Sequence, residues 1–126
     1  MKLLEDNVRS VLLDMEDHMK LHEDWQNRDL MDASERTKIN IDDYVYTIDN
    51  LLDGGYILGK RLGTMGDGDI YMIKSLSFSG HQFLDTVRSP EIWRQTKNVT
   101  SKVGSVTVEI LSQVATNIIS KQLGLN

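Results

Sequence analysis

A pair of adjacent glycines, Gly54-Gly55, separates a helical pattern from two strand patterns and constrains the fold more than any other feature of the sequence. Residues 41–53 carry apolar side chains at helical spacing, and glycine ends helices because it takes the left-handed conformation without a Cβ clash. We therefore expect Gly54 or Gly55 to have a positive φ. Residues 56–62 and 70–76 are predicted strands, joined by the glycine-rich turn GTMGDGD. This order indicates a winged helix.

The predicted helix at residues 41–53 has clear signals at its start. Asn40 is the expected N-cap, because its side chain can accept a hydrogen bond from a free amide of the first turn. Asp42 and Asp43 follow in that turn, where the helix dipole favours acids. The expected buried stripe is Val45, Ile48, Leu51 and Leu52.

An amphipathic helix is predicted near the N-terminus, at about residues 3–20. Its apolar residues share one helical face: Leu4, Val8, Val11, Leu12, Met15 and Met19. Residues 22–40 are polar and lack a sustained period, so a short strand or an irregular loop is expected there. The expected anchors of that segment are Trp25, Leu30, Met31 and Ile39.

Further helices are predicted after the second strand. Ser77 or Ser79 can cap a short helix, and Pro90 suits the first turn of the next one. The stretch from residue 105 fits a strand or a helix, and its length favours the helix. The predicted fold is α+β: a winged-helix-like domain with a two-stranded wing at residues 1–88, and a C-terminal helical extension at residues 89–126, forming one structural unit.

The charges are divided unevenly along a chain whose formal net charge is −5. Residues 1–54 hold 14 acids and 6 bases, whereas residues 55–126 hold 5 acids and 8 bases. A nucleic-acid surface is therefore expected in the second part. The candidate nucleic-acid-binding residues are Lys60, Arg61, Lys74, Arg94 and Lys97.

The helix at residues 41–53 takes the place of a recognition helix, but its charge is unfavourable for binding in the major groove of DNA. It has four aspartates and no base, so phosphates would repel it. Tyr44, Tyr46, Thr47 and Asn50 offer hydrogen bonds to base edges. We expect DNA contacts to be weak and a protein partner to be at least as important.

Two surfaces are candidates for such a partner: the acidic helix and the apolar C-terminal helix. The C-terminal helix is expected either to pack on the first helix or to pair with a second copy as a homodimer. The candidate partner-binding residues are Asp42, Asp43, Tyr46, Asp49, Asn50, Ile110, Val114 and Ile118.

Catalysis, metal binding and cofactors are not expected. The chain has no cysteine, and no nucleophile, base and acid form a recognisable set. His18 and His22 are four residues apart, but a metal site needs three or four converging ligands. His81 is expected to hydrogen-bond backbone beside the wing. The N-terminus is acidic and no apolar run is long enough to span a bilayer, so a cytoplasmic location without membrane contact is expected.

Two segments carry a resemblance to a known family: LSFSGHQFLDTVRSPEIWRQTK at residues 76–97 and SKVGSVTVEILSQVATNI at residues 101–118. The chain resembles the bacterial and phage proteins grouped as domain of unknown function 2513. The resemblance implies a winged-helix-like fold and an association with phages and mobile elements. It implies no known activity.

These observations predict a non-catalytic binding protein of phage or mobile-element origin. It would act as a regulator through protein contacts, with weak DNA contacts as a further possibility. The alternative is a protein inhibitor or adaptor, for example one that counters a host defence, with the acidic half as a mimic of DNA.

Overall fold

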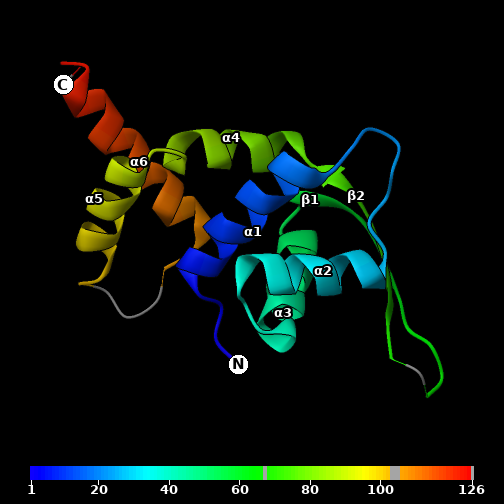
Figure 1. The fold of residues 1–126 in the computed structure, drawn as a ribbon. Helices are drawn as coiled ribbons and strands as arrows, with labels where there is room; N and C mark the ends of the chain where they lie inside the picture. Colours follow the sequence, from blue (N-terminus) through cyan, green and yellow to red (C-terminus); the bar gives the residue numbers. More distant parts are fainter. Residues whose placement is uncertain (67, 103–105, 126) are drawn as a thin grey trace. The chain divides into compact units, whose positions relative to one another are not determined.

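Six helices and a two-stranded antiparallel sheet make up residues 1–66, 68–102 and 106–125, which a computed structural model describes (Figure 1). In chain order they are α1 (Glu5–His18), α2 (Asn27–Thr37), α3 (Ile41–Asp53), β1 (Ile57–Leu62), β2 (Ile70–Leu76), α4 (Phe78–Val87), α5 (Pro90–Thr100) and α6 (Val108–Gln122). The α+β class and the pair of antiparallel strands are confirmed, and the order of the elements is compatible with a winged helix.

The chain divides into two compact units, Met1–His81 and Gln82–Asn126. The division falls within α4, whereas the sequence placed the start of the extension after residue 88. The first unit holds α1, α2, α3 and the hairpin; the second holds α5 and α6.

The prediction for residues 22–40 is wrong, because most of this segment is the helix α2. The Asp29 carboxylate accepts a hydrogen bond from the Gln26 amide at 2.8 Å and so closes the first turn. The buried face of α2 consists of Leu30, Ala33 and Ser34, and two of these side chains are too small to register as an apolar stripe. The expected anchor Met31 is exposed.

Trp25, just before α2, pairs with β2 as a one-residue third strand. Its amide donates to the Ile73 carbonyl at 2.7 Å, and the Ile73 amide donates to the Trp25 carbonyl at 2.8 Å. Trp25 is itself buried. The segment before α2 is thus fixed to the hairpin by both its backbone and its side chain.

Helix α3 has the predicted bounds and the predicted cap, since the Asn40 side chain accepts a hydrogen bond from the Asp43 amide at 2.9 Å. Its buried face differs from the prediction, because Val45 and Leu52 are only half-buried. The fully buried positions are Tyr44, Thr47, Ile48 and Leu51. These lie at helical spacing, so a tyrosine and a threonine complete the apolar face.

A buried ion pair joins α1 to α2. The Asp14 side chain is almost fully buried, and the Arg36 guanidinium donates to its two oxygens at 2.6 and 2.8 Å. These hydrogen bonds raise the pKa of Arg36. The guanidinium also lies 5.7 Å from the centre of the Trp25 ring, within cation–π range. Burial, followed by the nearby Asp14 charge, raises the pKa of Tyr44 on α3.

The turn after α3 contacts the start of α4 very closely. Gly55 has φ +77°, as predicted for one of the two glycines. Ser77 caps α4: its hydroxyl accepts from the Gly80 amide at 3.0 Å and donates to the Gly55 carbonyl at 2.6 Å. A Cβ on Gly80 would lie 2.0 Å from the Tyr56 carbonyl oxygen, so only glycine fits there.

In the second unit, α5 and α6 pack on each other. Ser89 caps α5, with Pro90 at the start of the helix as predicted, and Thr107 caps α6. The prediction that the last stretch is helical is confirmed from Val108 to Gln122. The sequence also predicts that Gly104-Ser105 breaks or caps the helix before the last stretch, and these two residues lie outside the described residues.

Gly80→Ala tests the contact between the turn and α4. Alanine normally stabilises a helix relative to glycine. Here the added Cβ meets backbone, and we expect a loss of unfolding free energy at or above the upper end of the usual 1–3 kcal/mol range for overpacking. The matched control is Gly63→Ala, where the nearest atom lies 3.7 Å from the added Cβ. Urea denaturation of the three proteins gives the measurement, and equal stabilities of both variants would contradict the proposed clash.

Arg36→Met tests the ion pair, because it leaves the Asp14 carboxylate buried without its partner. We expect a loss of roughly 2–4 kcal/mol of unfolding free energy, as for broken buried pairs, reduced somewhat because Arg36 is about one-third exposed. The double variant Asp14→Leu, Arg36→Met removes both charges and should recover most of that loss. A double variant as unstable as the single one would show that apolar packing by Arg36, and not the charge of Asp14, is what matters.

Candidate interaction surfaces

One face of the hairpin is apolar yet exposed. Lys60 pairs with Met72 and Leu62 pairs with Ile70, and directly paired residues of antiparallel strands lie on the same face. The three apolar side chains of this group are between 39 and 52% exposed, and Lys60 is exposed as well. We call these four residues the wing face. The other row of β2 includes Tyr71 and Ile73, which are buried in the first unit.

The residues of the wing face other than Lys60 were not among the predicted site residues. The signal for them is the alternation of β2, in which both rows carry large apolar side chains. A two-stranded sheet that buries one row leaves the other row uncovered, so an apolar second row indicates a surface with a function.

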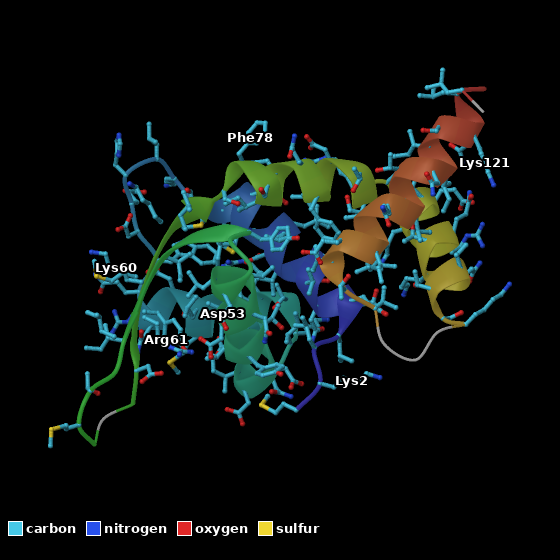
Figure 2. The ribbon with its side chains drawn as sticks, turned by 180° about the vertical axis from the view of Figure 1, so that it is seen from behind. Lys2, Asp53, Lys60, Arg61, Phe78 and Lys121 are labelled. Carbon is cyan, nitrogen blue, oxygen red and sulfur yellow. The ribbon has the colours of Figure 1, made fainter. Side chains whose placement is uncertain are left out.

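Arg61 lies on the opposite row of the hairpin from Lys60 (Figure 2). Its guanidinium forms ion pairs with side chains of the first unit. Its Nη1 is 3.0 Å from Asp49 Oδ1 on α3, and its Nε is 3.6 Å from Asp69 Oδ2. The Tyr71 hydroxyl donates to the same Asp49 oxygen at 2.8 Å. The hydrogen bond with Asp49 raises the pKa of Arg61. Arg61 therefore connects the hairpin to α3, with two carboxylates beside its charge.

The other predicted nucleic-acid residues fall into two groups. Lys74 is exposed on β2, so the first unit brings Lys60, Arg61 and Lys74 onto one hairpin. In the second unit Arg94 forms hydrogen bonds of 2.6 and 3.1 Å with the Glu91 carboxylate, which lower the pKa of Glu91 to about 2. The Lys97 ammonium lies 6.0 Å from the centre of the Trp93 ring.

The acidic helix α3 uses much of its polar surface internally. Asp43 accepts a hydrogen bond from the Asn40 side chain at 2.9 Å, and Asp49 binds Arg61 and Tyr71. Asn50 donates to the Tyr46 carbonyl at 2.8 Å, and both side chains are half-buried. Asp42 is exposed.

Two of the side chains expected to offer hydrogen bonds to bases are not accessible. Tyr44 and Thr47 are fully buried, with exposed fractions of 0 and 1%. The expectation that they can contact base edges is wrong, because they complete the apolar face on which α3 packs.

The predicted partner residues of α6 form a stripe at intervals of four residues. Ile110 is exposed, whereas Val114 and Ile118 are half-buried. Leu111 and Ala115 on the neighbouring face are buried. Packing on α5 thus covers part of the apolar surface of α6, and pairing with a second copy stays a prediction.

Two of the three histidines, His18 and His81, lie close to carboxylates. His18 Nδ1 lies 2.9 Å from the Asp14 carbonyl oxygen and 3.2 Å from its carboxylate. His81 Nδ1 faces the Glu16 carboxylate at 4.0 Å, where a backbone bond was expected. Within the described residues, no three or more His, Cys, Asp or Glu side chains converge as metal ligands. No helix in that part of the chain is long and apolar enough to cross a membrane.

The fold and these surfaces define a small α+β protein with a two-stranded hairpin, one face of which is apolar and exposed. The chain belongs to the family described as "Hypothetical protein (DUF2513)", whose sequence pattern matches residues 2–107. The match ends before α6, so it supports the resemblance noted for residues 101–118 only in part. No curated protein and no solved structure matches the chain significantly.

Asp49→Asn tests the link between the hairpin and α3 through the ionisation of Tyr71. Burial and, next, the hydrogen bond to Asp49 raise the pKa of Tyr71 from 10.0 to about 12. A raised tyrosine pKa stabilises the fold below pH 10, and this contribution is lost as the pH rises towards about 12. In the variant we expect the Tyr71 pKa to fall towards 10, as measured by NMR titration of the tyrosine ring carbons. Asp53→Asn on the same helix is the control, and an equal pKa of Tyr71 in both variants would refute the link.

Proposed function

We propose that this chain is a non-catalytic binding protein that acts through protein contacts, with the wing face as its docking surface. The observation that carries the proposal is the exposure of Leu62, Ile70 and Met72 on one face of a hairpin whose other face is buried. Contiguous exposed apolar side chains cost free energy in water, and such patches mark interaction sites.

The chemistry of the wing face indicates what its partner presents. Lys60 pairs with Met72 within the wing face, and Lys74 is exposed further along β2. An apolar patch bordered by carboxylates would match both features, since complementary charges orient partners and exclude incorrect ones. The proposed occupant is therefore an acidic, apolar surface of another protein.

DNA is the less favoured partner. Arg61 and Arg94 are held by carboxylates, and α3 has no base to offset its aspartates. Phosphates would gain little from the apolar side chains that surround Lys60. Contacts through Lys60 and Lys74 alone would be weak and would decline steeply with salt, with a slope of about one per phosphate neutralised.

The inhibitor or adaptor alternative is also a form of protein binding. Mimicry of DNA by α3 receives less support than docking through the wing face, because Asp43 and Asp49 already have partners within the fold. An origin in phages or mobile elements belongs to this proposal and rests on the resemblance alone.

Photo-crosslinking tests the proposal at a single residue. A benzophenone amino acid replaces Met72 in the wing face and, as the matched control, the exposed Met31 on α2. After irradiation in the cells that encode the protein, we expect a specific protein adduct from position 72 and none from position 31. Adding Lys60→Glu should reduce that adduct severalfold, because it places a like charge against the proposed acids.

Three outcomes would contradict protein docking through the wing face. They are equal adducts from both positions, an adduct unaffected by Lys60→Glu, and an adduct with nucleic acid in place of protein. Titration of the protein into a labelled DNA duplex at two salt concentrations tests the third outcome separately, because it measures DNA binding directly. Under the proposal, binding to the duplex is absent, or weak and lost at the higher salt.

A further inference from the structure

A pocket of about 280 Å³ lies in the first unit, at the end of β2 that is farther from the hairpin turn. It is formed by the end of α1, the turn at residues 19–22, the end of β2 and the first turns of α4. They come from two separate parts of the chain, residues 15–22 and 74–81, and the close contact of Gly80 with Tyr56 fixes the position of α4. The pocket is slightly smaller than those that hold drug-sized ligands, so it suits a small molecule.

The floor of the pocket is apolar. Met15 is fully buried, Leu76 is nearly so, and Met19 is half-buried. At the mouth, Leu21 lines the same pocket and is 84% exposed. A ligand with an aliphatic body would cover Leu21 and fill the floor, removing apolar area from water at about 25 cal/mol per Å².

The rim of the pocket carries more positive than negative charge. Lys20 and Lys74 line it, both are exposed, and the described structure places no carboxylate at ion-pair distance from either ammonium. The single acidic side chain of the lining is Glu16, which His81 faces at 4.0 Å. The rim therefore favours an anion, and two lysines above an apolar floor match one carboxylate on an aliphatic chain.

The turn that brings Lys20 and Leu21 to the pocket has an unusual backbone. His22 has φ +64°, in the left-handed region that few residues other than glycine occupy. The Glu23 amide donates to the Lys20 carbonyl at 3.1 Å and closes this turn. The strained conformation thus holds Lys20 and Leu21 at the mouth of the pocket.

We propose that this pocket binds a small aliphatic monocarboxylate, with its chain against Met19, Leu21 and Leu76 and its carboxylate at Lys20 and Lys74. The source of that chemistry is either a free carboxylic acid or the carboxyl end of an apolar peptide. The site is independent of the proposed protein docking, and only Lys74 lies near both surfaces.

Ligand titrations followed by NMR test the charge and the apolar body separately. The probes are sodium octanoate, octan-1-ol, octylamine and N-acetyl-dileucine. We expect octanoate to bind more tightly than octanol, and octylamine to bind least. From hexanoate to octanoate the affinity should rise roughly fourfold per methylene. Tighter binding of N-acetyl-dileucine than of octanoate would identify a peptide end as the source, and the reverse order a free acid.

Substitution of the rim lysines locates the site. Lys20→Met and Lys74→Met should each weaken octanoate binding roughly two- to fivefold, the range of an exposed ion pair, and leave octanol binding unchanged. Lys121→Met, on the exposed surface of α6, is the matched control and should have no effect (Figure 2). These exposed lysines can be changed without loss of the fold.

Three results would overturn the proposal: no saturable binding of octanoate or N-acetyl-dileucine, octanol binding as tight as octanoate, or an equal effect of Lys121→Met. Lys20→Met should also leave photo-crosslinking from position 72 unchanged. Failure of the pocket is thereby distinguished from failure of the wing face.

Discussion

The ion pair between Asp14 and Arg36 is the interaction on which the first unit depends. A carboxylate with 6% of its side chain exposed loses most of its hydration, so α1 tolerates Asp14 only with the guanidinium of α2 beside it. The same guanidinium lies over the Trp25 ring, and Trp25 is bonded through its backbone to Ile73 in β2. One charge pair thus fixes α2 on α1 and, through Trp25, holds the hairpin against the helices.

The sequence could predict the elements whose signals are local. The bounds of α3, the positive φ of Gly55 and both strands follow from a cap, a glycine and an alternating pattern. Helix α2 could not be predicted in this way, because its buried face consists of Leu30 and small side chains. Its position depends on Arg36 meeting a carboxylate 22 residues earlier, and no local pattern reports such a contact.

Charge counting predicted where the bases lie but not which of them remain available. Arg61 and Arg94 belong to the basic part of the chain, yet each is held by carboxylates. The register of the hairpin places Arg61 beside Asp49, and the spacing of residues on α5 places Arg94 beside Glu91. These positions decide whether each arginine is free to contact a partner. The lysines of the hairpin show the reverse case, since Lys60 and Lys74 keep exposed positions on it. The candidate surfaces therefore depend on which basic side chains are paired with carboxylates, and not on how many basic residues the sequence has.

Strand β2 supplies residues to the wing face, the core and the pocket, and its register therefore controls all three. Tyr71 and Ile73 point inward, Ile70 and Met72 point outward, and Lys74 reaches the pocket. A shift of one residue would exchange the two rows, because side chains alternate along a strand. The hydrogen bonds of Trp25 to Ile73 and of Tyr71 to Asp49 oppose such a shift from two sides. The irregularity between Leu58 and Gly59 then leaves Lys74 without a paired residue on β1, at the point where the strand meets the pocket.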